Sequence, residues 1–413
     1  MAGSGFAQTT ATLRRARDVG PRGVAQRLAA RVYRATGARA LDLHLDPADV
    51  VGDVPASLPV PAPRPAGGAG PGSPGLTVGW VTSPPAAGSG GHTTLFRMVE
   101  GLEARGHRCV VYLYDRHGLD ITQRAAELRR GWPGVRAEVR DARAGISGVD
   151  AVVASSWESA HVVLSYGAEP VHRLYFIQDY EPYFYPRGSE YELAAMTYRF
   201  PFRRIALGEM VAGCLRSELG QDSDVVPFGC DTRVYHPPKV KVPRSGVVLY
   251  AKPDVGRRGY LLARLALERF HRTHPEQEIH VYGSRPTGLP FPVSYHGSVS
   301  PAALNELYGR VVAGLAMSFT NISLVAEEML AAGVVPVVND SPLSRADLPN
   351  PHVGWAEPTA EGIAVELAAA VDRPDADTYA AQVAESVMGR SWDLTQELVA
   401  QIVEDEVRRG DRA

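Results

Sequence analysis

The stretch that most constrains the fold runs from Val311 to Asp340, where two apolar runs flank a polar turn and a helical segment. Residues 311–319 are mostly apolar, which is typical of a strand buried on both faces of a parallel sheet. A polar turn follows, and then a helical segment that ends at Gly333. Residues 334–338 form the second apolar run. The order of strand, turn, helix and strand predicts a βαβ unit.

In such a unit a ligand lies at the carboxyl end of the strands. The N-terminus of the helix offers unpaired N–H groups and the positive end of the helix dipole to an anion, typically a phosphate. Glu328 lies about one turn further in, where a carboxylate can accept hydrogen bonds from ribose hydroxyls. The alternative is a capped helix on which Glu327 and Glu328 are simply solvated, and the local pattern leaves both interpretations open.

Composition narrows the class of protein. The 413 residues are enough for two or three domains, and 45% hydrophobic with 22% charged residues is ordinary for a soluble globular chain. A net charge of −3 gives no field that would draw it to nucleic acid. The three scattered cysteines have neither metal spacing nor a disulfide pattern. Without an apolar run of about 18 residues or a signal core, we expect no membrane span, no export and a cytoplasmic location.

Residues 1–51 form a basic segment that we expect to be helical. Eight arginines lie between Thr9 and Arg39 against one acid, Asp18, and apolar residues recur at loosely helical spacing. A basic amphipathic helix can lie on an anionic membrane surface, so we expect peripheral contact with the inner face of the membrane. The alternative is an arginine-rich helix that docks on its own domain. Residues 52–75 are rich in Pro, Ala and Gly and read as a linker.

Residues 76–240 are expected to form a first Rossmann-like domain that binds the acceptor. A strand from Thr77 is followed by the glycine-rich turn 88–91, which opens a helix. Glycine lets the backbone approach a ligand closely, although the spacing is neither that of the dinucleotide fingerprint nor that of the P-loop. His92 at the start of this helix could contact a substrate or simply cap the helix.

The same domain contains a block dense in aromatic and acidic residues, residues 178–200. Aromatic rings stack on the apolar faces of sugars, and carboxylates accept bonds from sugar hydroxyls. We therefore predict acceptor contacts from Tyr180, Glu181 and Tyr183, with His92 beside them. The alternative is a covering loop whose aromatic side chains belong to the core.

Residues 241–376 repeat the alternation of strands and helices, which predicts a second parallel sheet and a domain that binds the donor. The first strand–helix turn of this domain concentrates Lys252, Arg257 and Arg258, and cations at that place suit a diphosphate. The alternative is exposed surface charge. Residues 377–413 are helical by pattern, with Trp392 in the middle, and we expect them to cross back to the first domain.

Four motifs in this order resemble a known family: GSGGH (88–92), VPFGCDTRVYHP (226–237), LYAKPDVGRRG (249–259) and EEMLAAGVVPVV (327–338). From Leu76 to Val399 the chain resembles the retaining glycosyltransferases of family 4. Two longer segments, FIQDYEPYFYPRGSEYELA and SFTNISLVAEEMLAAG, resemble a subgroup with bacterial rhamnosyltransferases of cell-surface glycan assembly.

This resemblance implies the GT-B fold, in which two Rossmann-like domains face each other across a cleft. It implies metal-independent, retaining transfer of a sugar, such as rhamnose, from a nucleoside diphosphate sugar (a dTDP- or UDP-sugar) to a glycan, lipid-linked or small-molecule acceptor, with no cofactor. By position, Glu328 would bind the ribose, Lys252 and Arg258 would hold the diphosphate, Asn321, Ser323 and Leu324 would form the phosphate turn, and Gly90 and Gly91 would face the donor. Thr320 stands where the family has its first glutamate.

The predicted catalytic residues are thus Lys252, Arg258 and Asp179, and Thr320 is grouped with the donor site. Three alternatives stay open. Asp179 and Glu181 could form a metal–diphosphate site in a different class of transferase. A nucleotide-sugar 2-epimerase would share the fold. A catalytically silent partner that binds a nucleotide sugar or a glycan would fit the replacement of the glutamate by Thr320.

Overall fold

The computed structural model describes residues 44–62, 75–86, 88–240, 242–322 and 324–409. The chain divides into two compact units, residues 1–50 with 115–118 and residues 51–114 with 119–413. In the first unit the described residues include a short 3₁₀ helix, η1 (Pro47–Asp49), whose N-cap Asp46 accepts a hydrogen bond from the Ala48 N–H at 3.0 Å. The arginine-rich stretch and half of the linker, residues 63–74, lie outside the described residues.

The second unit contains two parallel sheets, and the first has the strand order β3-β2-β1-β4-β5-β6-β7. Its strands are β1 (Thr77–Thr82), β2 (Arg108–Leu113), β3 (Glu138–Asp141), β4 (Ala151–Ala154), β5 (His172–Ile177), β6 (Arg203–Leu207) and β7 (Asp224–Val226). Its helices are α3 (Gly90–Ala104), α4 (Ile121–Gly131), α5 (Trp157–Tyr166), α6 (Ser189–Thr197) and α7 (Glu209–Leu219), with the 3₁₀ turns η2 (Ala142–Ala144) and η3 (Glu181–Phe184). The interior strand β5 is buried throughout, as expected of a sheet covered on both faces.

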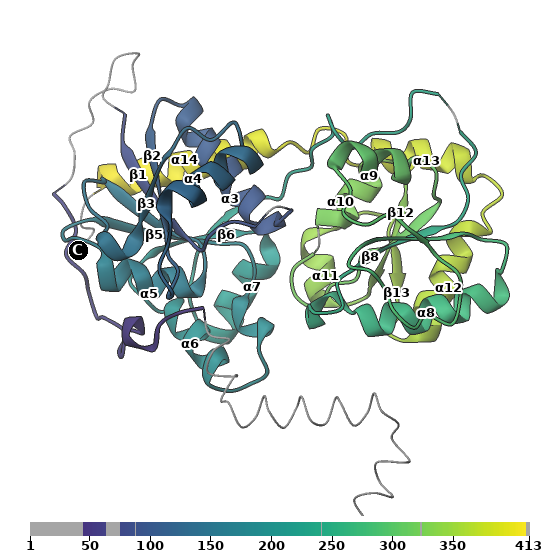
Figure 1. Ribbon diagram of the computed structural model, residues 1–413, viewed down its shortest axis with the longest axis horizontal. Coiled ribbons are helices and arrows are strands. Elements are labelled where there is room, and N and C mark those ends of the chain that lie inside the picture. Colours follow the sequence, from purple (N-terminus) through teal and green to yellow (C-terminus); the bar gives the residue numbers. More distant parts are fainter. Residues whose placement is uncertain (1–43, 63–74, 87, 241, 323, 410–413) are drawn as a thin grey trace, which may run out of the picture. The chain divides into compact units, whose positions relative to one another are not determined.

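The second sheet has the order β10-β9-β8-β11-β12-β13 and is also parallel. Its strands are β8 (Val247–Ala251), β9 (Ile279–Gly283), β10 (Ser294–Tyr295), β11 (Ala313–Leu315), β12 (Val335–Asn339) and β13 (Gly354–Ala356). Its helices are η4 (Gly256–Arg258), α8 (Tyr260–Thr273), α9 (Pro301–Tyr308), α10 (Leu324–Ala331), α11 (Pro342–Asp347), α12 (Ala360–Val371) and α13 (Ala376–Glu385). We call the first sheet with its helices the first lobe, and the second sheet with its helices the second lobe (Figure 1).

Both sheets reverse their strand order once, between β1 and β4 and between β8 and β11. This is the doubly wound arrangement, in which the crevice at the reversal binds ligands. The predicted fold class, two Rossmann-like sheets in one chain, is confirmed.

The strand predicted over residues 311–319 is shorter than expected. β11 ends at Leu315: the Ala316 N–H still donates to the Val337 carbonyl of β12 at 3.0 Å, but the backbone of Ser318 pairs with a side chain instead of a neighbouring strand. The Ser318 N–H donates to Asn339 Oδ1 at 2.8 Å, and Asn339 Nδ2 donates to the Ser318 carbonyl at 2.6 Å. The chain therefore leaves the sheet early and forms a loop, residues 316–322, before α10.

The C-terminal tail contains two helices. α13 ends at Glu385, and the final helix, α14 (Trp392–Arg409), begins at Trp392, which we had placed in the middle of a helical stretch. The break is stabilised by the hydrogen bond from the Cys230 N–H to the Arg390 carbonyl at 3.0 Å. α14 then packs on the first lobe: an added Cβ at Gly101 of α3 would lie 2.7 Å from Gln396 Cβ, which explains the glycine.

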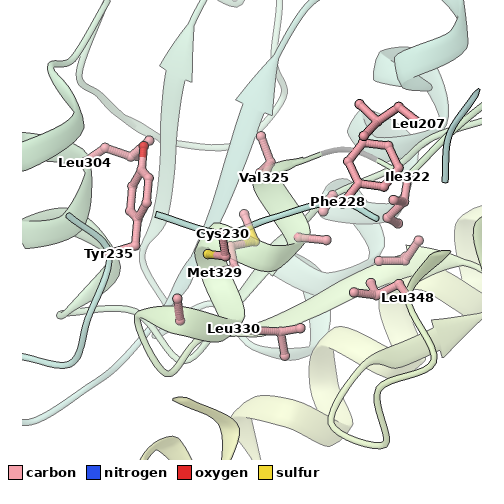
Figure 2. Packing of buried hydrophobic residues seen from close by; sticks show 14 of the residues in the cluster. Leu207, Phe228, Cys230, Tyr235, Leu304, Ile322, Val325, Met329, Leu330 and Leu348 are labelled. Atoms are coloured by element: carbon pink, nitrogen blue, oxygen red, sulfur yellow. The ribbon is translucent and has the colours of Figure 1, made fainter. Parts of the chain in front are cut away.

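Helix α10 is buried on most of its surface, and Figure 2 shows apolar side chains of both lobes around it. Phe228 and Cys230 belong to the segment that leaves the first sheet, whereas Met329 and Leu330 belong to α10. Cys230 Sγ lies 3.6 Å from the Glu327 carbonyl oxygen. Burial raises the pKa of the Cys230 thiol to about 12, so it acts as a small apolar group here. The described cysteines are all free and buried.

Candidate functional site

The candidate residues lie at the carboxyl ends of strands in both sheets. The turn 88–91 follows β1, and residues 178–181 follow β5. In the second lobe the turn 252–259 follows β8, and the loop 316–322 follows β11. Because both sheets are parallel, each segment lies at the edge where doubly wound folds bind ligands. Ser323 lies outside the described residues.

The Asp179 carboxylate is held by groups from the second lobe. Its Oδ2 accepts a hydrogen bond from the Thr320 hydroxyl at 2.9 Å, and its Oδ1 accepts one from the Asn321 N–H at 3.3 Å. Arg257 Nε lies 3.9 Å from Oδ2. Burial raises the pKa of Asp179, while the charges of Arg258 and Arg257 and the two hydrogen bonds oppose that rise. We call these five residues the Asp179 cluster.

Most of the cluster is buried, although the Arg257 side chain stays 30% exposed. Thr320 is 1% exposed, and Asn321 is buried with its Nδ2 donating to the Gln178 carbonyl at 2.8 Å. The Arg257 guanidinium carbon lies 3.8 Å from the centroid of the Phe184 ring, a cation–π contact. Arg258 Nη1 donates to Ser318 Oγ at 2.9 Å. The alternative that these arginines are exposed surface charges is therefore wrong.

Lys252 lies at the other end of the same turn. Its Nζ is 5.0 Å from the centroid of the Tyr250 ring, which stacks on the Tyr282 ring at 4.7 Å. Of the two predicted diphosphate cations, the structure places Arg258 in the Asp179 cluster and Lys252 over an aromatic ring.

The glycine-rich turn forms a capped helix start. Ser89 is the N-cap of α3, and its hydroxyl accepts a hydrogen bond from the His92 N–H at 3.4 Å. The His92 ring lies between Ser89 Oγ, 2.8 Å from Nδ1, and the Ser83 carbonyl, 3.2 Å from Nε2. Burial lowers the pKa of His92, and the bond to Ser83 opposes this. These contacts match the capping alternative. An added Cβ at Gly91 would lie 3.8 Å from Gln178 Oε1, whereas one at Gly90 would meet open space.

The predicted acceptor residue Tyr180 lies in the core, contrary to our expectation that its ring faces a substrate. It is 0% exposed, and its ring lies 4.7 Å from that of Tyr183 and 5.5 Å from that of Tyr198. Tyr183 is partly exposed, and its hydroxyl donates to Glu218 Oε1 at 3.3 Å. Of the two tyrosines, only Tyr183 is placed where an acceptor could reach it.

Glu181 is also taken up by internal contacts. Its Oε2 accepts hydrogen bonds from the Trp157 N–H at 2.6 Å and from the Tyr175 hydroxyl at 3.1 Å. Burial raises the pKa of Glu181 well above its usual range. The carboxylates of Asp179 and Glu181 thus have separate sets of partners, which does not fit a shared metal–diphosphate site. Among the described residues, no group of three or more His, Cys, Asp and Glu side chains could hold a metal ion.

Glu328 lies in a small recess beside the segment that joins the sheets. The recess is lined by Arg97, Gly229, Cys230, Asp231, Leu324, Glu327, Glu328 and Trp392. Arg97 Nη2 lies 3.6 Å from Asp231 Oδ2, and its guanidinium carbon lies 4.9 Å from the centroid of the Trp392 ring. Burial raises the pKa of Glu328 to about 7, against the charge of Arg97 and a hydrogen bond from the Tyr235 hydroxyl. The alternative that both glutamates of α10 are solvated is wrong.

Glu327, the neighbour of Glu328, pairs with an arginine from the break before α14. Its Oε1 lies 2.9 Å from Arg390 Nη2, and the side chain is 1% exposed. Burial raises the pKa of Glu327 to about 7, and Arg390 opposes the rise. This carboxylate fixes α10 to the C-terminal segment, so that both glutamates line the recess but only Glu327 pairs with Arg390.

A second carboxylate joins the lobes at Asp347 in α11. It accepts hydrogen bonds from the Glu209 N–H at 2.5 Å and the Met210 N–H at 3.2 Å, and so caps α7 of the first lobe. Burial raises the pKa of Asp347 to about 6, which these two bonds oppose. Gly208, at φ +90°, precedes α7, and an added Cβ there would lie 2.5 Å from the Asp347 carboxylate. Glycine is therefore required at this contact.

Four residues at or near the site were not predicted from the sequence: Arg97, Asp231, Asp347 and Arg390. Asp231 lies within the motif 226–237, which we had quoted without assigning it a role. The other three are ordinary charged residues in helices or loops, and their importance comes from partners more than 60 positions away in the chain. No local pattern marks them.

Two protein-family models match the chain. The one described as the WsaF N-terminal domain matches residues 143–210, and the one described as the WsaF C-terminal domain matches residues 245–368. A curated relative, the O-antigen biosynthesis protein RfbC of Myxococcus xanthus, is 30% identical over 329 residues. That alignment covers 73% of this chain but only 25% of the relative.

Solved structures show the fold. HepE of Anabaena, solved in complex with UDP and glucose, aligns with a TM-score of 0.61 at 12% identity, over 81% of this chain and 100% of that one. WaaG, a glycosyltransferase involved in lipopolysaccharide biosynthesis, aligns with a TM-score of 0.57 at 14% identity, over 79% and 99% of the two chains. This chain has the GT-B fold. At these identities the likeness extends to the fold alone.

Proposed function

We propose that this protein is a glycosyltransferase of polysaccharide assembly that takes a sugar from a nucleoside diphosphate sugar. The acceptor would be a glycan, a lipid-linked glycan or a small molecule. The observation that carries the proposal is the Asp179 cluster, where two arginines, a hydroxyl and a backbone N–H converge at the carboxyl edge of the second sheet. Glu328 lies on the helix that follows, as a ribose contact requires.

The site suits the departure of a diphosphate. As the sugar–phosphate bond breaks, negative charge grows on the leaving phosphate, and fixed cations stabilise that charge. Arg258 and Arg257 would be these cations. The hydroxyl of Thr320 and the N–H of Asn321 would donate further hydrogen bonds to the phosphate. Lys252 would reach the outer phosphate from the start of the same turn. Closure of the lobes over the donor would also keep water from taking the sugar.

Several finer assignments belong to the proposal. The matched WsaF domains and the O-antigen relative support cell-surface glycan assembly, and the sequence resemblance adds retention of configuration and a deoxysugar such as rhamnose. The complex of HepE with UDP supports a uridine diphosphate donor, and a thymidine diphosphate is the second donor we propose. Transfer without a metal is supported by the cations of the cluster, which take the place a metal would hold.

Turnover tests the proposal. The protein is incubated in EDTA with UDP-, dTDP- and GDP-sugars and a mixture of glycan acceptors, and both nucleotide release and product are followed by mass spectrometry. A transferase releases the nucleoside diphosphate and adds the sugar to an acceptor. A 2-epimerase would change the sugar without an acceptor, a silent partner would bind nucleotide and release none, and an enzyme of the metal-dependent class would stay inactive until Mn²⁺ or Mg²⁺ is added.

We also propose that the protein works in the cytoplasm, at the inner face of the membrane, through its arginine-rich residues 1–50. No helix within the described ranges is both long and apolar enough to cross a membrane. The support for contact with the membrane surface is the composition between Thr9 and Arg39, where there are eight arginines and one acidic residue. In a flotation assay with anionic vesicles, the full chain should bind, and a chain without residues 1–50 should bind less.

A further inference from the structure

The partners of Asp179 form an anion-binding set. Thr320 offers a hydroxyl and Asn321 a backbone N–H, while Arg257 and Arg258 contribute positive charge. All four come from the second lobe, and each acts on the carboxylate as a donor or a cation. A phosphate group binds to the same kinds of group.

The anion that fills this set comes from the other lobe. Asp179 follows β5 of the first sheet, and its carboxylate is 8% exposed once it lies among these partners. The neighbouring contacts run in the same direction: the Gln178 carbonyl accepts from Asn321 Nδ2, and the Phe184 ring lies against Arg257. The first lobe thus places a carboxylate, a carbonyl and a ring face onto the phosphate-binding groups of the second.

These donors cannot serve two anions at once. The Thr320 hydroxyl has one proton to donate, and the Asn321 N–H has one as well. A phosphate brought next to the Asp179 carboxylate would also be repelled by its like charge. A donor phosphate that takes these bonds must therefore move the carboxylate away.

Resting on the proposed function, we propose that Asp179 occupies the donor-phosphate site in the unliganded protein and competes with the diphosphate of the donor. This assignment replaces the catalytic role predicted for Asp179 from the sequence. In this proposal the contact between the lobes lowers the affinity for the donor, and the contact breaks when a diphosphate displaces the carboxylate. The apparent affinity for any diphosphate is then reduced by the fraction of molecules in which Asp179 holds the site.

The test compares wild-type protein with Asp179→Asn, which keeps the shape and loses the charge. Binding of inorganic pyrophosphate, of UDP and dTDP, and of uridine and thymidine is measured by calorimetry in EDTA. We expect the variant to bind pyrophosphate and the diphosphates about tenfold more tightly, because the competing side chain loses the strength of about one charge-assisted hydrogen bond. The nucleosides should bind as they do to the wild type. Asp222→Asn is the matched control, because this exposed aspartate has the same charge but precedes β7, at the edge of the first sheet opposite to the carboxyl ends of the strands. It should shift each affinity by less than twofold.

The outcomes separate this inference from the proposed function. Equal or weaker diphosphate binding by Asp179→Asn overturns the competition, and if the wild type still binds diphosphates, the donor site stands. Tighter pyrophosphate binding without binding of any nucleotide supports the competition and contradicts the donor site. Thermal unfolding checks that the variant is folded. If it is not, Asp179→Ser, which also lacks the charge, is measured in its place with the same expectations.

Discussion

The substitution Glu328→Gln isolates the role of the carboxylate in the recess of α10. The side chain stays nearly the same size, so the packing around Met329 and Leu330 is kept. If Glu328 accepts hydrogen bonds from the two ribose hydroxyls, the amide can replace only one acceptor oxygen and carries no charge. A hydrogen bond to a charged group is worth about 1.5–3 kcal/mol, so affinity for a nucleoside diphosphate should fall roughly 10- to 100-fold.

The pH dependence adds a second signature. Burial raises the pKa of Glu328 to about 7 in the free protein, and the nucleotide is expected to bind the carboxylate form. Affinity should therefore rise as pH increases toward 7 and level off above it, whereas Glu328→Gln should lose this dependence. The sign for stability is opposite. The pKa of Glu328 is higher in the folded protein than in the unfolded chain, so the free energy of unfolding of the wild type falls as pH rises from about 4.5 to 7. Glu328→Gln does not titrate and should lack this pH-dependent loss of stability.

The assay is calorimetric titration with UDP and dTDP between pH 5.5 and 8.5, with unfolding midpoints measured at the same pH values. Glu361→Gln is the control, because this exposed glutamate of α12 pairs with Arg269 at 3.4 Å in the same lobe. It should leave both affinity and pH profile unchanged. A Glu328→Gln variant with wild-type affinity and a wild-type pH profile would refute the ribose assignment.

Two further predictions concern the second lobe. Arg258→Ala should weaken binding of UDP or dTDP about tenfold while uridine and thymidine bind as before, because the lost cation faces phosphate and not base; equal losses for nucleoside and diphosphate would argue against a phosphate role. Asp347→Ala should lower the free energy of unfolding by about 1–3 kcal/mol in urea titrations, since the N–H groups of Glu209 and Met210 lose their acceptor. Asp347→Asn keeps an acceptor oxygen and should lose less, and the idea fails if the two variants are equally stable.

The alternation of apolar runs and helical segments was enough to predict two parallel sheets. The strand predicted from Thr77 begins at that residue in the structure, as β1, and the helix before Gly333 is α10. What the pattern could not show is where an apolar run stops being a strand. Three of the four residues 316–319 are apolar, yet Asn339 from the next strand pairs with Ser318 and ends the ladder.

The site was predictable only in part, for a similar reason. Motif positions identified Arg258, Thr320, Asn321 and Glu328 as neighbours on one lobe. The sequence could not tell that the Asp179 carboxylate turns toward them and the Glu181 carboxylate turns into the core, because both are acidic residues and they lie only two positions apart. Which aromatic side chains of the block 178–200 are buried also depends on α5 and α6, which no local pattern records.

The most direct test of the central claim is a thermal-shift panel of nucleoside diphosphates and nucleotide sugars with EDTA present. A ligand that binds only the folded protein raises its melting temperature by mass action. We predict that the nucleoside diphosphate of one base, and the nucleotide sugars with that same base, raise the melting temperature without metal. Arg258→Ala should largely remove this increase. If no nucleotide stabilises the protein until Mn²⁺ or Mg²⁺ is added, the metal-independent donor site described here is wrong.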